Sequence, residues 1–90
     1  MTRTEAIEFV YKETTGFDYI LEMPKEKSYV FINEDGINLF IYEDETFELK
    51  YVLPKTTFTL TTHRLSLSNF KKTMSRFGRT IWRISVIWED

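Results

Sequence analysis

The sequence predicts an α+β fold in which an antiparallel sheet of about five to six strands packs with two helices, in the order α-β-β-β-β-β-α-β. Three observations predict this fold. Apolar residues recur at helical spacing near each end of the chain, short apolar and aromatic runs follow one another between them, and Gly, Pro or Asp-Gly separates these runs. Ninety residues with 8 Phe, 5 Tyr and 2 Trp suffice for one well-filled core, so we expect a single domain over residues 1–90.

The first predicted element is a helix over residues 4–15. Thr2 and Glu5 have the spacing of a capping box, and Gly16 stands where a helix often ends on a left-handed glycine. Phe9 lies off the apolar stripe, so we predict that it is exposed. The stripe consists of Ala6, Ile7, Val10 and Thr14.

The predicted strands cover residues 17–23, 28–33, 37–43, 46–53 and 56–62. Asp35-Gly36 between two apolar runs is a strong hairpin signal. A two-residue loop there pairs Ile32 with Leu39, Val30 with Ile41, Phe31 with Phe40 and Tyr29 with Tyr42. Because side chains alternate along a strand, this register makes one face aromatic and the other aliphatic. It also places Phe47 and Leu49 on the aromatic face, although a slip of one residue would reverse this.

A second helix is predicted over residues 67–77, with Ser66 or Ser68 as its N-cap and Gly78 at its end. Its apolar stripe is Leu67, Phe70, Met74 and Phe77. The last predicted strand covers residues 79–88. One of its faces carries Trp82, Ile84, Val86 and Trp88.

Part of this order, α-β-β-β-α, resembles the double-stranded-RNA-binding domain over about two thirds of the chain. Lys71-Lys72 matches part of that family's lysine-rich helix start. The family's Gly-Pro-x-His loop has no counterpart here, and the strand predicted after Gly78 is additional. The sequence is therefore not assigned to that family.

Composition narrows the class of protein. There is no cysteine, which excludes a disulfide scaffold and a Cys-ligated zinc site. Residues 1–8 are charged and lack the apolar stretch of a signal peptide, and no apolar run approaches the roughly 20 residues that span a bilayer. We therefore expect a cytoplasmic protein that does not interact with membranes.

No residue pattern indicates catalysis, so we predict no catalytic residue, no metal and no cofactor. His63 is the only histidine, and Ser66 and Ser68 nearby lack any nucleophile signature. A hard cation could be bound by an acidic cluster, but such clusters are more often solvated turns. The cluster consists of Glu43, Asp44, Glu45 and Glu48. The segment at Asp35-Gly36 lacks the glutamate of a calcium loop, since Tyr42 takes its position.

Charge is distributed unevenly along the chain. Residues 1–53 hold five Lys/Arg against twelve Asp/Glu, a net of −7, and residues 54–90 hold seven against two, a net of +5. Such asymmetry favours a charged partner. One alternative function is therefore nucleic-acid binding by the basic segment, against which the overall charge of −2 argues. The residues predicted for this alternative are Arg64, Lys71, Lys72, Arg76 and Arg83. Alternatively, these basic residues form the solvated face of a helix and balance the negative charge of residues 1–53.

The predicted sheet is apolar on both faces, whereas two helices can cover one. The other face would then be an exposed patch, which usually marks a protein-binding site; alternatively, a curved sheet encloses its own aromatics. We predict a non-enzymatic protein-binding module that modulates or inhibits its partner, with a homodimer as an additional expectation. By analogy, small phage-type inhibitors occlude basic grooves of nucleic-acid enzymes. The predicted partner-binding residues are Tyr29, Phe31, Phe40, Tyr42, Glu43, Asp44 and Glu45.

Overall fold

A computed structural model describes residues 1–53, 55–61 and 63–76. It confirms the predicted α+β class, with a helix, then antiparallel strands, then a second helical segment. The elements are α1 (Arg3–Glu13), β1 (Phe17–Met23), β2 (Ser28–Asn33), β3 (Ile37–Tyr42), β4 (Thr46–Leu53), β5 (Thr56–Thr59), β6 (Leu65–Ser66) and the 3-10 turn η1 (Leu67–Asn69), which continues into α-helix over residues 70–76. The strand predicted over 79–88 lies outside the described residues.

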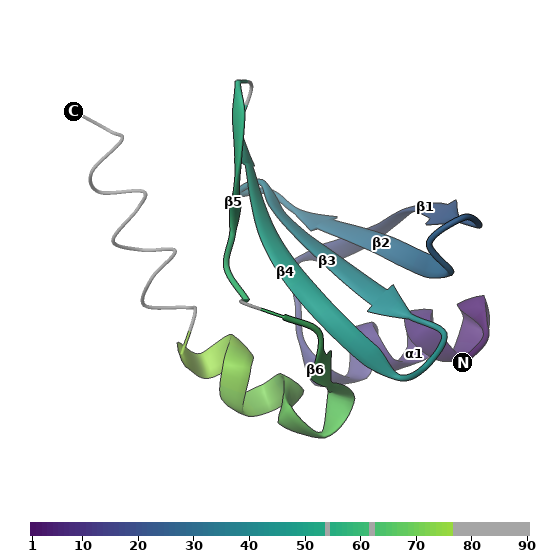
Figure 1. The fold of residues 1–90 in the computed structure, drawn as a ribbon. Coiled ribbons are helices and arrows are strands. Elements are labelled where there is room, and N and C mark those ends of the chain that lie inside the picture. The colour runs from purple at the N-terminus through teal and green to yellow at the C-terminus, as the bar shows by residue number, and fades with distance from the viewer. Residues whose placement is uncertain (54, 62, 77–90) are drawn as a thin grey trace.

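The strands form one sheet in the order β1-β2-β3-β4-β5, and β6 pairs with the start of β4 (Figure 1). Five strands and the short β6 therefore separate the helices, where the double-stranded-RNA-binding domain has three. The α1 helix and the helical segment 67–76 both lie below the sheet in Figure 1. The sheet thus has an inner face toward the helices and an outer face away from them.

The α1 helix begins as the sequence predicts. The Thr2 hydroxyl accepts a hydrogen bond from the Glu5 amide at 3.2 Å, and the Glu5 carboxylate accepts one from the Thr2 amide at 2.9 Å. This capping box satisfies two amides that the first helical turn leaves without partners. Phe9 is not exposed as predicted, because its ring meets that of Phe70 edge-on at 5.2 Å. The stripe residue Val10 is fully buried.

The β2–β3 hairpin has a different register from the predicted one. Tyr29 lies opposite Ile41, and Phe31 lies opposite Leu39. The cause is a three-residue turn over 34–36. The Asn33 side chain accepts hydrogen bonds from the amides of residues 35 and 37, at 3.0 and 2.8 Å, and Gly36 takes a φ of 87°. The predicted two-residue loop is therefore wrong by one residue, which exchanges the faces of one strand relative to the other.

Each face consequently mixes aromatic and aliphatic residues, and the predicted separation into an aromatic and an aliphatic face does not occur. Phe47 lies opposite Ile41 on the inner face, not with Phe40 and Tyr42. Phe70 packs edge-on against Phe47 at 5.2 Å and so joins the second helical segment to the core. The inner face carries Tyr29, Phe31, Leu39, Ile41, Phe47 and Leu49. The outer face carries Val30, Ile32, Phe40, Tyr42, Glu48 and Lys50.

Candidate partner-binding surface

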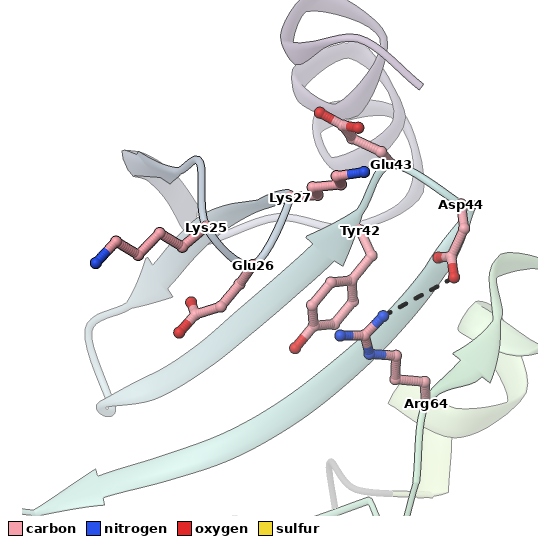
Figure 2. A pocket seen from close by; sticks show the side chains of 7 residues that line it. All are labelled: Lys25, Glu26, Lys27, Tyr42, Glu43, Asp44 and Arg64. Carbon is pink, nitrogen blue, oxygen red and sulfur yellow. Dashed lines mark ion pairs between the residues drawn. The ribbon is translucent and has the colours of Figure 1, made fainter.

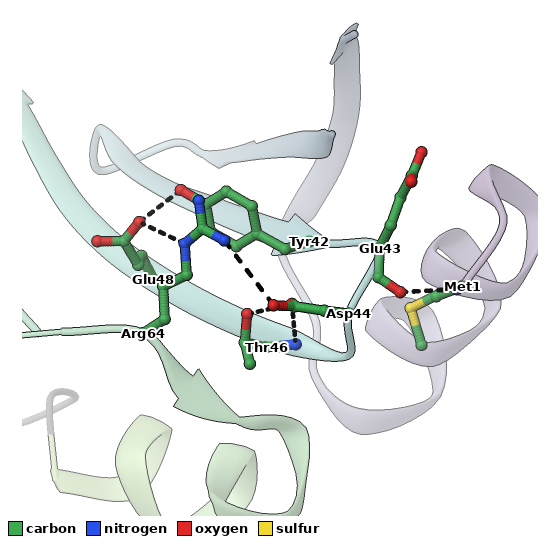
Figure 3. Close-up of polar contacts among 7 residues, drawn as sticks. All are labelled: Met1, Tyr42, Glu43, Asp44, Thr46, Glu48 and Arg64. Atoms are coloured by element: carbon green, nitrogen blue, oxygen red, sulfur yellow. Dashed lines mark hydrogen bonds and ion pairs between the residues drawn. The ribbon is translucent and has the colours of Figure 1, made fainter. Parts of the chain in front are cut away.

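A cluster of polar and aromatic side chains occupies the outer face where β3 ends (Figure 3). The Arg64 guanidinium lies 3.5 Å from the centroid of the Tyr42 ring. Its Nε is 3.9 Å from the Glu48 carboxylate, and its Nη1 is 3.9 Å from Asp44. The Tyr42 hydroxyl donates a hydrogen bond to Glu48. The four side chains are thus joined by one stacked contact, one hydrogen bond and two long ion pairs.

Local sequence accounts for this arrangement. Tyr42 is the last residue of β3, and Glu48 lies on β4 opposite Phe40, so the two side chains are diagonal neighbours on one face. Arg64 directly precedes β6, whose pairing with Thr46 brings it to the same end of the sheet. A two-residue strand therefore fixes the position of the only arginine in the cluster.

Tyr42 is held as a neutral hydrogen-bond donor. Burial, and then the hydrogen bond to Glu48, raise the pKa of Tyr42 to about 12. Removing the proton would place a second negative charge beside a carboxylate in a poorly solvated position. At physiological pH this phenol is therefore protonated and donates its hydrogen bond to Glu48.

Two turns meet beside the cluster and enclose an open cavity of about 720 Å³ (Figure 2). The turns are held together because the Glu43 amide donates to the Lys27 carbonyl at 3.0 Å. Both turns also contain a residue in the left-handed region, Lys27 with φ of 52° and Glu45 with φ of 64°. Glu43, Asp44 and Glu45 are all exposed. The cavity is lined by Lys25, Glu26, Lys27, Tyr42, Glu43, Asp44 and Arg64.

The predicted partner-binding residues are divided by the structure. Tyr29 and Phe31 are 5% and 0% exposed on the inner face, so they belong to the core and cannot form a contact surface. The predicted four-residue aromatic surface is therefore wrong, because the hairpin register separates its members. Phe40 is half-buried on the outer face, with the Lys50 ammonium 4.9 Å from its ring. Tyr42 and the acidic turn remain together at the cavity, but Tyr42 is 6% exposed, so the acidic turn is the exposed part of this group.

The predicted basic residues are divided as well. Arg64 lies on the outer face among carboxylates, whereas Lys71 pairs with Glu13 of α1 at 3.8 Å. Lys72 and Arg76 are exposed and form no ion pair within residues 1–53, 55–61 and 63–76. Arg83 lies outside the described residues. Because Phe70 anchors the helical segment to the inner face, Arg64 and the lysines do not form one continuous basic surface.

Sequence reasoning missed the contribution of the first turn. The pairing of β2 with β3 brings Lys25 and Lys27 close to Tyr42, and no residue spacing in the sequence predicts this proximity. The one available signal was Pro24, which marks the turn without indicating what it faces. Sequence reasoning also assigned Arg64 to the alternative nucleic-acid-binding site and did not predict its contacts with acidic residues.

Within the described part of the chain, no group of three or more His, Cys, Asp or Glu residues is arranged to hold a metal ion. The same part contains no helix with the length and apolarity needed to cross a membrane. Comparisons with protein-family models, curated proteins and solved structures found no significant match.

Proposed function

We propose that this protein is a non-enzymatic protein-binding module that modulates or inhibits its partner, and that the surface around the cavity makes the contact. The observation that carries the proposal is the convergence of Tyr42, Glu43 and Asp44 with Arg64 around one open cavity of about 720 Å³. Arginine is a residue type that protein interfaces favour near their centres, with charged residues at the rim. The Arg64 side chain is 47% exposed, and the buried Tyr42 ring beneath it holds it in place.

The charges around the cavity favour a protein partner over a small anion. The rim combines two lysines and Glu26 of one turn with carboxylates of the other. Lys25, Lys27 and Glu43 form no ion pair among the described residues. Mixed exposed charge suits a partner surface with its own pattern of charges, because such a pattern steers association and fixes register. The exposed acidic turn favours basic groups on the partner.

Capture from a lysate of the native host, read by quantitative mass spectrometry, tests this proposal. The variant Glu43→Lys/Glu45→Lys reverses two exposed charges at the rim, and Glu8→Lys on α1 is the control with an exposed charge elsewhere. We expect a protein that wild type and the control capture and that the rim variant loses. That protein, once purified, should bind the chain directly. Capture that is equal for all three variants, or absent, would contradict the proposal.

Lys72 and Arg76 support the alternative of nucleic-acid binding, because both are exposed and neither forms an ion pair among the described residues. Fluorescence anisotropy with labelled RNA and DNA distinguishes the two functions. Phosphate contacts weaken steeply with added salt. Binding at low salt that Lys72→Ala/Arg76→Ala abolishes would favour the alternative, and no binding at low salt would end it.

We also propose a cytoplasmic location, which the lack of cysteine supports, and self-association into a homodimer. Cell fractionation tests the first. Sedimentation at micromolar concentration tests the second, since a species of 10.9 kDa would exclude a dimer in that range.

A further inference from the structure

The sheet edge at β1 presents apolar side chains beside open backbone. β1 is the first strand in the sheet order, and among the described residues its only pairing partner is β2. The register shifts between Tyr19 and Leu21, so that Ile20 has no partner on β2. Ile20 is 50% exposed and Leu21 is 44% exposed. Two large aliphatic side chains thus stand next to backbone groups that a further strand could pair.

This edge has little of the protection that edge strands usually carry. Natural edges are blunted by lysine, proline or bulges, and β1 has the bulge but neither residue. Its only charges are Asp18 and Glu22, which are exposed and form no ion pair within the described residues. The edge therefore carries two uncompensated negative charges on either side of its aliphatic centre.

The edge also ends at an apolar hollow. A cavity of about 470 Å³ lies at the β1–β2 turn, with a wall of mostly apolar atoms, and Met23 and Pro24 belong to it. Met23 is the last residue of β1. If a partner strand paired with β1, the side chain at one end of that strand would therefore lie next to the hollow.

We infer that β1 binds an extended segment of a partner protein by strand addition, and that this segment carries basic residues on either side of an apolar centre. Backbone pairing would supply affinity, and the side-chain pattern would supply specificity. Asp18 lies opposite Ile32 of the outer face and Glu22 opposite Tyr29 of the inner face, so the bulge at Ile20 puts the two carboxylates on opposite faces of the sheet. A strand that skips the bulged residue has two positions between those facing Asp18 and Glu22, so the matching segment has two cationic residues with two apolar residues between them. The hollow shares Lys25 and Glu26 with the cavity of the proposed function, whereas no residue of β1 lines that cavity, so the β1 edge is an additional surface next to it.

A second copy of this chain fits the edge less well. β1 carries two acidic residues and no basic one, so pairing two copies along this strand would bring four carboxylates and no cation to one interface. Like charges brought together at an interface repel one another. Charge complementarity therefore selects a basic segment over a homodimer at this edge.

The test uses a fluorescein-labelled eight-residue peptide with the central sequence KVVK and threonine flanks, whose two lysines lie on opposite faces of a strand, together with its acidic analogue EVVE. We expect the basic peptide to bind the full chain at low ionic strength and to slow amide hydrogen exchange over residues 17–23. Ile20→Lys should weaken binding by about tenfold, because the exposed half of the isoleucine no longer leaves water. Phe58→Lys is the matched control, since Phe58 is 43% exposed on β5 at the other edge of the sheet.

A charge swap keeps the test decisive if Ile20→Lys fails to fold. Asp18→Lys/Glu22→Lys should bind the acidic peptide and lose the basic one. The inference is overturned if both peptides bind the wild type equally, or if protection falls on β5. It is also overturned if residues 17–23 become protected without peptide as protein concentration rises, which would indicate a second copy. Glu43→Lys/Glu45→Lys should leave peptide binding unchanged, so failure here is distinguishable from failure of the proposed function.

Discussion

The stack of Arg64 on Tyr42 is the contact on which the candidate surface depends, and a double-mutant cycle measures it. Tyr42→Leu removes the ring but keeps an apolar side chain, and Arg64→Met removes the charge but keeps the stem. The guanidinium is 3.5 Å from the ring centroid, and the Arg64 side chain is 47% exposed. A cation–π contact contributes about 0.5–1 kcal/mol when exposed and about 2 kcal/mol when desolvated. We therefore expect a coupling free energy of about 1 kcal/mol.

Urea unfolding followed by far-UV circular dichroism gives the four free energies of unfolding. Repeating the cycle in a Glu48→Gln background separates the stack from the interactions that Tyr42 and Arg64 both make with Glu48. Most of the coupling should persist there, because the contact of the guanidinium with the ring does not involve Glu48 and the Arg64–Glu48 ion pair is long, at 3.9 Å. Coupling below about 0.3 kcal/mol in the wild-type background, the usual error of additivity, would refute the stacked geometry.

Three further predictions concern the fold that positions this surface. Phe70→Ala should lower the free energy of unfolding by about 3–5 kcal/mol, because Phe70 is 1% exposed and packs against two rings. The control Lys72→Ala should change it by less than about 0.5 kcal/mol, and equal urea midpoints for the two variants would contradict the prediction. Gly36→Ala should cost more than Gly16→Ala, since both glycines have positive φ but only at Gly36 would the new Cβ meet a backbone oxygen, that of Val52, at 3.2 Å; thermal unfolding of the two variants compares them directly. The stability that Tyr42 gains over Tyr42→Phe should be fully present below pH 10 and decline as the pH rises toward about 12, because the folded-state pKa of Tyr42 is raised above its unfolded value of 10; denaturation at pH 8 and pH 11 tests this, and a constant difference would exclude it.

Local signals predicted the elements well. The capping box of Thr2 and Glu5 forms as the sequence indicated, because both partners lie within one helical turn. The strand boundaries around the Asp-Gly hairpin hold to within one residue, since β3 ends at Tyr42 and was predicted to reach residue 43. The second helical segment is less regular than predicted, since residues 67–69 form a 3-10 turn, with the Ser66 hydroxyl accepting from the Ser68 amide at 3.4 Å. The strand predicted to reach residue 62 ends at Thr59.

The hairpin register could not be read from the same signals. Asp35-Gly36 fits a two-residue turn and the end of a three-residue turn equally well. What decides between them is the Asn33 side chain, which accepts two amide hydrogen bonds and so extends the turn. That single residue determines that Tyr29 and Phe31 face the helices while Phe40 and Tyr42 face outward. Helical periodicity failed at Phe9 for a related reason, because it describes one helix and not the ring of Phe70 beside it.

Folding brings residues of the acidic part of the chain, 1–53, into contact with residues of the basic part, 54–90. Two of the basic residues in the C-terminal part of the chain are used to hold that part to the acidic part, Arg64 through Asp44 and Glu48, and Lys71 through Glu13. These contacts lie on opposite faces of the sheet, so they reduce any continuous positive surface among the described residues.

Four carboxylates that form no ion pair among the described residues lie on the two proposed surfaces: Glu43 and Glu45 at the turn after β3, and Asp18 and Glu22 on β1, beside the exposed Ile20 and Leu21. An exposed carboxylate next to apolar surface attracts a cation and offers it a place to bury its stem. We therefore expect the β1 edge to favour a partner with lysine or arginine among apolar residues and to repel nucleic acid. The cavity rim has mixed charge, because Lys25, Lys27 and Arg64 line it beside the carboxylates. Salt dependence separates these cases, since added salt should slow the association of a basic protein while leaving the apolar part of its affinity in place.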